Sequence, residues 1–423
     1  MLDEFVNAIY GGFDVENSIE PTMWRELTKI MNDATAKGLS KGEFSIDHNK
    51  GFLDSVKHAN EVFAAFKTHA MGKSMASKLI DDKGNLKPFD KWMKDISSIS
   101  SHHVGSWLKT EYNTAVLRAH NAADWRSFME NKDIMPNLRW MPTTSPDAEA
   151  VHRGYWEKKL TLPVEHPFWN KHHPGDRWNC KCSLESTDDP ASPDDILDDL
   201  PIEPAQRGLE NNPGKDGKMF NDTHPYFPKN CNQCSFYKNR GFKNKVKTWF
   251  TNQEKDCFNC GYIDNETDKL KQKVDVRSFV GRVLETRFAD NSGVQFGTLS
   301  KDEFEFIKGK GVSIKSPNLY ITDVKVKHAT RPFKRGIGKS VSDEEFKYFI
   351  DNFSDRSKCS LYWDINKQNI MYTTKINDKI QKYIFNINKK ISFNHKEIDL
   401  NHFVTAGYIK EDNISASIYI KIR

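Results

Sequence analysis

The chain has 423 residues, of which 37% are hydrophobic and 29% charged, and it carries a formal net charge of +5. This composition is typical of soluble globular protein, and no apolar run approaches the roughly 20 residues of a membrane-spanning helix, so we expect no membrane partner. Cationic residues outnumber acidic ones from Glu266 onward, which favours a polyanion partner at that end, although a solvated surface can carry the same excess.

Residues 1–135 are predicted to form a helical region. Two sets of apolar residues recur there at three- and four-residue steps, the spacing of an amphipathic helix. Gly84 to Pro88 separates the two helices, and Pro136 ends the second. The first set is Phe52, Leu53, Val56, Ala59, Val62, Phe63, Phe66 and Ala70, and the second is Val104, Leu108, Tyr112, Ala115, Val116, Ala119 and Ala123. These faces are expected to pack on one another, with a partner protein as the alternative.

Residues 136–190 form a region rich in Cys and His, where helical periodicity is lost. Cys180 and Cys182 make a CxC pair, and a turn at Trp178-Asn179 would aim both thiols inward. Together with His152 they are candidate zinc ligands. Other histidines close enough in sequence to complete the site are His166, His172 and His173. The alternative is a packed turn with two buried thiols and surface histidines.

Residues 191–265 combine an acidic, proline-rich linker with a second cysteine motif. Cys231, Cys234, Cys257 and Cys260 make two CxxC pairs, the spacing of a structural zinc knuckle, whose four thiolates leave no open position for catalysis. Two disulfides or four unligated thiols are the alternatives. Met1 to Phe13 is acidic and lacks the apolar core of a secretory signal, so we expect a reducing compartment, where thiol pairs favour metal.

Residues 266–423 are predicted to form a basic α+β module. Ser342 is the expected N-cap of a helix that reaches about Phe353, because acidic residues fill its first turn. Short alternating segments rich in aromatic and branched residues follow and indicate an antiparallel sheet. They are 359–364, 369–374, 382–388, 402–409 and 414–422. The chain is therefore expected to be an α+β multidomain protein with a helical N-terminal region, a Cys/His-rich middle with a zinc knuckle, and a C-terminal sheet.

The order of features from Thr110 to Cys182 resembles the Mu-type phage head morphogenesis family, also called minor head or minor capsid proteins. The features are Thr110-Glu111-Tyr112-Asn113, Leu138-Arg139-Trp140 with Asp147, Phe168-Trp169, Pro174-Gly175 and Asn179-Cys180-Lys181-Cys182. Lys181 replaces the usual Arg, and Asp147 and His152 stand where many relatives have a further cysteine pair. The resemblance implies a virion component that binds portal and capsid proteins in the host cytoplasm and stays inside the capsid.

The basic module is similar to the phage-borne nucleases of the barnase, EndoU, colicin and RelE-like superfamily, which cut RNA without metal. This similarity implies an endoribonuclease delivered with the DNA, and an immunity protein as a further candidate partner. Such cleavage needs groups that move protons and cations that hold the phosphate, roles that suit His, Arg and Lys. The candidates are His328 as acid or base, Arg331 and Lys334 as phosphate clamps, and Thr373 or His402 as supporting groups.

Other interpretations of the basic module stay open. His402 and Thr405 would face opposite sides of a regular strand, and His328 fits a solvated basic turn equally well. The chain would then be purely structural, with a basic end that binds packaged DNA through salt-sensitive phosphate contacts. A different effector enzyme is the third option, because Glu303 and Glu305 form an ExE as in ADP-ribosyltransferases, although they precede the strands that should lead into that motif.

Overall fold

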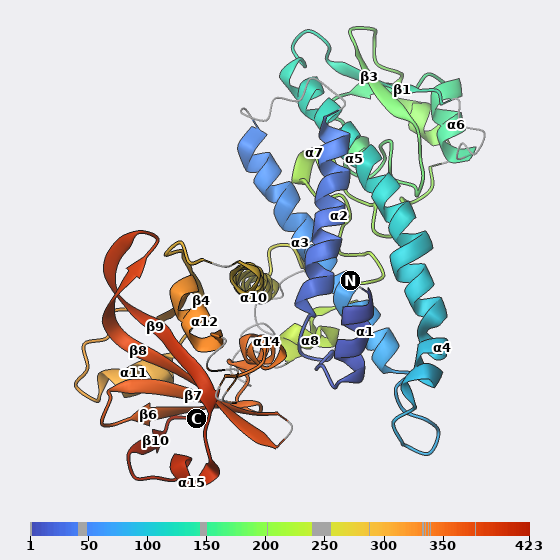
Figure 1. The fold of residues 1–423 in the computed structure, drawn as a ribbon. Helices are drawn as coiled ribbons and strands as arrows, with labels where there is room; N and C mark the ends of the chain where they lie inside the picture. The colour runs from blue at the N-terminus through green and yellow to red at the C-terminus, as the bar shows by residue number, and fades with distance from the viewer. Residues whose placement is uncertain are drawn as a thin grey trace. The chain divides into compact units, whose positions relative to one another are not determined.

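A computed structural model of the chain describes residues 2–40, 49–143, 150–200, 202–238, 255–286, 288–331, 334, 336, 338, 340–376 and 378–423. The chain divides into two compact units, Met1–Thr267 and Asp268–Arg423. Helix α10 (Gly261–Glu285) crosses the division. Figure 1 shows helices in the N-terminal unit and a large sheet in the C-terminal unit, which confirms the α+β class and the helical N-terminal region.

The N-terminal unit is built around α2, which packs on both α3 and α5. Gly38 lies at the crossing of α2 and α5, where a Cβ atom would come within 2.3 Å of the Val116 carbonyl oxygen. The two helices therefore approach more closely than any larger residue at position 38 would allow. The helices of this unit are α1 (Leu2–Tyr10), α2 (Pro21–Leu39), α3 (Lys50–Ala76), α4 (Phe89–Ser100), α5 (Trp107–Glu130), α6 (Ala150–Glu157), α7 (Pro213–Asp216) and α8 (Ser235–Lys238).

The predicted break at Gly84 to Pro88 is confirmed, since α3 ends at Ala76 and α4 begins at Phe89. A π-helical segment, Ser101–Ser106, joins α4 directly to α5. The predicted apolar set on α5 fits this arrangement, because Leu108, Ala115 and Ala119 are all buried.

A small antiparallel sheet follows α5, with strand order β2-β1-β3. Its strands are β1 (Asn137–Met141), β2 (Thr161–Pro163) and β3 (Ser183–Thr187). Apolar side chains from β1, β2 and α6 form a separate core with Trp125 of α5, and both thiols of the CxC pair belong to it. Short 3-10 helices lie at Pro167–Asn170, Asp194–Asp199 and Cys231–Gln233.

Two charged side chains are buried inside the helical part of this unit. Lys67 of α3 donates to Glu111 of α5 at 2.5 Å, and the hydroxyl of Tyr226 donates to the other carboxylate oxygen at 2.6 Å. The side chains of Lys67 and Glu111 are only 1% and 4% exposed. Burial lowers the pKa of Lys67 and raises that of Glu111, so the loss of hydration outweighs the pairing in both groups.

The C-terminal unit contains a seven-stranded sheet in the order β10-β6-β7-β8-β9-β5-β4. Its strands are β4 (Gly293–Thr298), β5 (Asn318–Thr322), β6 (Cys359–Asp364), β7 (Asn369–Ile376), β8 (Lys379–Phe393), β9 (Lys396–Tyr408) and β10 (Tyr419–Lys421). Its helices are α11 (Lys301–Lys308), α12 (Asp323–Thr330), α14 (Asp343–Asn352) and α15 (Glu411–Ile414). The predicted helix from Ser342 is confirmed, with a capping box between Ser342 and Glu345.

The predicted antiparallel sheet needs two corrections. Each pair of neighbours in the series β10-β6-β7-β8-β9 is antiparallel. Strand β9 pairs in parallel with β5, so the sheet is mixed. The predicted strand at 414–422 shrinks to Tyr419–Lys421, because the acidic pair Glu411-Asp412 begins the short helix α15.

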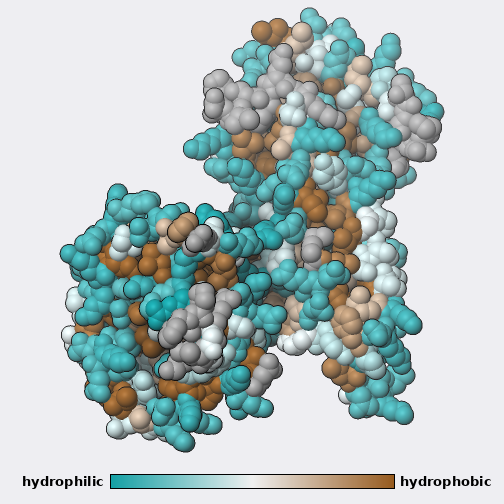
Figure 2. Space-filling view, in the orientation of Figure 1, coloured by the Kyte–Doolittle hydropathy of each residue, from teal (hydrophilic) through white to brown (hydrophobic). Residues whose placement is uncertain are grey.

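No helix within the described ranges is long and apolar enough to cross a bilayer. The visible face of each unit is mostly hydrophilic and carries smaller hydrophobic areas among the polar residues (Figure 2).

Candidate functional site

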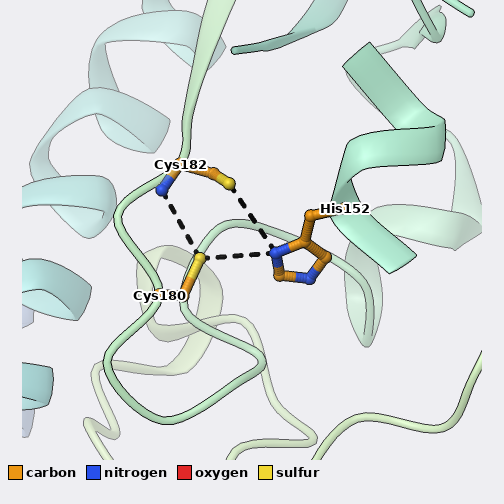
Figure 3. A group of neighbouring side chains, drawn as sticks. All are labelled: His152, Cys180 and Cys182. Atoms are coloured by element: carbon orange, nitrogen blue, oxygen red, sulfur yellow. Dashed lines mark hydrogen bonds between the residues drawn. The ribbon is translucent and has the colours of Figure 1, made fainter. Parts of the chain in front are cut away.

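The strongest candidate metal site lies beside the small sheet of the N-terminal unit. His152 on α6 points its Nδ1 atom at Cys180 and Cys182, with N to S distances of 3.5 and 3.7 Å (Figure 3). Asn179 has a φ of 59°, a left-handed conformation that Asn tolerates well, and this turn aims both thiols inward as the sequence predicts. All three side chains are buried.

Asp176 fixes the orientation of the His152 ring. Its Oδ1 atom lies 2.8 Å from His152 Nε2, and both groups are buried. Burial lowers the pKa of His152, but hydrogen bonds to Asp176 and Cys180 raise it to about 9 in the metal-free protein. Burial raises the pKa of Asp176, yet its hydrogen bonds with His152 and His172 bring it down to about 2. The ionised Asp176 accepts a hydrogen bond from Nε2–H, so Nδ1 is the nitrogen that can bind metal once its own proton is released.

One imidazole nitrogen and two thiolates form a donor set that fits zinc, and they supply three of its four usual ligands. Among the described residues, this is the one group of three such side chains whose ligand atoms lie within 4.8 Å of one another. Asp147, the acid near this motif in the sequence, lies outside the described residues.

The other three candidate histidines do not join this cluster. His166 accepts a hydrogen bond from the Phe168 amide at the start of a 3-10 helix. His172 Nδ1 lies 3.6 Å from Asp176, behind the ligand His152. His173 is buried between the carbonyl groups of Pro174 and Asn211. Sequence reasoning missed Asp176, although its place directly after Pro174-Gly175 is a usable signal.

The four cysteines of the predicted zinc knuckle border one cavity of about 570 Å³. Burial raises the pKa of Cys234, and the neighbouring thiols of Cys260 and Cys231 raise it further. No three of the four sulfur atoms lie as close together as the His152 cluster does, and all four thiols are free. Residues 239–254, between the two pairs, lie outside the described part of the chain, so the knuckle stays a prediction.

Two of the predicted nuclease residues, Thr373 on β7 and His402 on β9, lie in the C-terminal sheet, whereas His328 is on α12 and Arg331 follows that helix. One face of this sheet carries the apolar core, with Tyr372, Tyr383 and Ala406 in one row of paired residues. The row that contains Thr373 and Lys382 therefore faces the other way. By the register, His402 lies on that second face as well, but about 15 Å from Thr373, so these two cannot serve one reacting phosphate.

The expectation that His402 and Thr405 face opposite sides is wrong. Asn386 pairs with His402 and Ile384 with Thr405, and the register shifts between them. Val404 is the extra residue of a β-bulge, so the strand is not regular and both side chains come to the same face. Lys334 reaches this face and donates to the Thr405 hydroxyl at 2.6 Å.

A group of cations adjoins this bulge. Burial lowers the pKa of His328, and the nearby charges of Lys334, Arg331 and Lys325 lower it further. Burial also lowers the pKa of Lys334, with added repulsion from Arg331 and Lys382. Within the described ranges these cations make no ion pair, and His328 and Arg331 are exposed. The cations around Lys334 would therefore attract an anion, and the His328 imidazole beside them is accessible and neutral at pH 7.

The ExE pair does not form a second candidate site. Glu303 is buried, caps α11 through the Ser300 amide, and forms an ion pair with Arg423 at 3.2 Å. Glu305 is exposed two positions along the same helix, where the two side chains cannot face each other.

Residues 84–185 match the family model described as Phage Mu protein F like protein. The matched segment includes α4, α5, strands β1 and β2, the start of β3, His152 and the CxC pair. The match supports the resemblance to phage head morphogenesis and minor capsid proteins. No curated protein and no solved structure matched the chain.

Proposed function

We propose that the chain is a minor head protein that binds the portal during assembly, is packaged in the virion, and carries its C-terminal unit as a ribonuclease. The minor head assignment rests on the family match, which covers the motifs from Thr110 to Cys182. The proposed contact for portal and capsid proteins is the helical surface around α4 and α5. Both helices belong to the matched segment, and Figure 1 shows α4 at a distance from the small sheet.

Peptides from both units are expected in purified phage particles. Portal-bound copies would also be enriched when the portal protein is isolated from assembling heads. Mass spectrometry of particles that have been treated with nuclease and washed in high salt measures this directly. Particles that lack peptides from residues 84–185 would contradict the head assignment, and particles with these peptides alone would show that the C-terminal unit is removed before packaging.

We infer that zinc binds at His152, Cys180 and Cys182, and that a second zinc binds at Cys231, Cys234, Cys257 and Cys260. The first site is supported by three converging donors and by the Asp176 contact, and the second by its two CxxC pairs around one cavity. Both metals have a structural role in this proposal, because the cysteines of each site lie in segments with little regular secondary structure.

The ribonuclease proposal rests on the cationic group beside the bulge in β9. A neutral, exposed His328 is suited to take the proton of a 2′-hydroxyl, and Arg331 and Lys334 are suited to hold the phosphate and its developing charge. Thr405 and His402 would support this centre from the sheet. Thr373 and His402 are about 15 Å apart, so they would not both contact the same phosphate.

The His328→Asn variant of the full chain is expected to cleave RNA about 10²–10⁴-fold more slowly than the unchanged protein, the usual effect of removing a general base. A fluorescently labelled RNA and gel analysis of the products measure the rate. His395→Asn is the matched control, because His395 is exposed in the turn between β8 and β9, at least nine residues along β8 from the pair of Ile384 with Thr405. It should cleave at the unchanged rate.

Equal rates for both variants would remove His328 from the mechanism. No cleavage by the unchanged protein, together with salt-sensitive DNA binding, would instead support the structural alternative, in which the basic unit neutralises packaged DNA.

A further inference from the structure

A cavity opens at one end of the C-terminal sheet, where β7, β8 and β9 meet α15 and β10. Its volume is about 850 Å³, within the range of about 300–1,000 Å³ that is usual for sites of small ligands. Four lysines line it, Lys375, Lys379, Lys382 and Lys410, against two acids, Asp378 and Glu411. The lining therefore has a net charge of +2, from four cations and two anions.

Three of these lysines form no ion pair with any residue that the structure describes. Lys375 forms an exposed ion pair with Asp378 at 3.8 Å, but Lys379, Lys382 and Lys410 make none with any described residue. Lys382 also repels Lys334, which is bonded to Thr405 on the same face of the sheet. An anion in the cavity would relieve this repulsion.

Aromatic rings share the cavity with the lysines. Tyr408 and Tyr419 both line it, and Lys379 Nζ lies 5.6 Å from the centre of the Tyr408 ring. The Tyr408 hydroxyl donates to Glu345 at 2.7 Å, which holds the ring in place. Fixed rings beside free cations are the pairing that recognises an unpaired nucleotide, because the base stacks while the phosphate is neutralised.

We propose that this cavity takes an unpaired nucleotide and makes the C-terminal unit a binder of single-stranded RNA. The proposal deepens the proposed function, on which it rests for the choice of RNA. Lys382, which lines the cavity, pairs across the sheet with Gly407, two residues from Thr405, so the cavity lies close to the Thr405 hydroxyl that Lys334 contacts. A base within a duplex is stacked and paired and cannot enter such a cavity, which sets the preference for single strands.

Binding is measured on the full-length protein by fluorescence anisotropy, with a 2′-O-methyl RNA that no 2′-hydroxyl mechanism can cleave. The unchanged protein is expected to bind the single strand more tightly than the same strand annealed to its complement. Lys379→Gln with Lys410→Gln should weaken single-strand binding and reduce the slope of log affinity against log salt by about 1.4, since each lost phosphate contact on a single strand is worth about 0.7. Tyr408→Leu should weaken binding about 5- to 150-fold, and Tyr408→Phe, which keeps the ring, should weaken it far less.

Lys389→Gln with Lys396→Gln is the matched control. Both lysines are exposed at the far end of the β8–β9 hairpin, at least about 20 Å from Lys382 along the strand. This control variant should bind RNA as the unchanged protein does. Equal affinity for the single strand and the duplex would overturn the proposal. So would an equal loss of RNA affinity in the cavity variants and the control variant, provided that all of them keep the thermal stability of the unchanged protein. Because the probe cannot be cleaved, a protein that binds it through the cavity but cuts no RNA would refute the ribonuclease and leave this inference standing.

Discussion

The Lys67→Met variant is expected to lower the free energy of unfolding of the N-terminal unit by about 3–5 kcal/mol, because it leaves Glu111 buried without its cation. The two pKa shifts already favour the uncharged forms, so Glu111 would take up a proton in the variant rather than stay ionised. Urea unfolding followed by tryptophan fluorescence measures the loss. Removing both charges in Lys67→Met with Glu111→Leu should recover much of it, since a buried pair can often be replaced by apolar side chains.

Lys73→Met on the same helix is the control for this comparison. Lys73 forms an ion pair with Glu16 at 2.8 Å, but both side chains are well exposed, so its loss should cost no more than about 1 kcal/mol. A Lys67→Met variant as stable as the control would show that the buried pair is not what holds α3 to α5. A double variant worse than both single ones would show that Tyr226, which bonds to both charges, depends on them.

Local sequence signals predict much of this fold. The apolar steps on α3 and α5 and the proline and glycine that end them are properties of neighbouring residues, and so is the capping box at Ser342. The same holds for β6, whose bounds agree with the prediction, because its alternation of buried and partly buried residues lies in six consecutive positions.

Features that depend on distant segments could not be predicted in this way. The bulge at Val404 is set by the pairing of β9 with β8, and it reverses which residues share a face with His402. The contact of Asp176 with His152 joins positions 24 residues apart, and that of Lys67 with Glu111 joins positions 44 apart. In the last two cases a buried polar side chain needs a partner, and folding brings that partner from a distant part of the chain.

Arg118 connects the metal site to the rest of the N-terminal unit. It is fully buried on α5, and its guanidinium donates to the carbonyl groups of Gly175 and Asn211 at 2.6 and 2.8 Å. It also donates to the side-chain oxygen of Asn211 at 2.9 Å. Gly175 directly precedes Asp176, the residue that orients His152. One cation therefore fixes the loop that positions a candidate metal ligand, and burial lowers the pKa of Arg118 to about 10, so this side chain stays charged.

The Arg118→Leu variant is accordingly expected to lose about 3–5 kcal/mol of stability, since buried carbonyl groups lose their donors. It should also bind zinc at the His152 site about 10–100-fold more weakly, as changes behind a metal ligand usually do. Urea unfolding and competition with a chromogenic chelator measure the two effects. Cys182→Ser is the reference, because it removes a ligand and should lower the zinc content by one ion per chain.

Arg126→Leu is the matched control on the same helix. Arg126 is partly exposed and donates one hydrogen bond, to Asn49 at 3.1 Å, so its loss should cost about 1 kcal/mol and leave the zinc affinity unchanged. If Arg118→Leu destabilised the unit but kept its zinc affinity, the loop would hold its shape without the cation, and Asp176 alone would position His152. If the unchanged protein and Cys182→Ser had the same zinc content, the two thiols and the imidazole would be a packed turn without metal. The loss of stability would then be the only effect of Arg118→Leu.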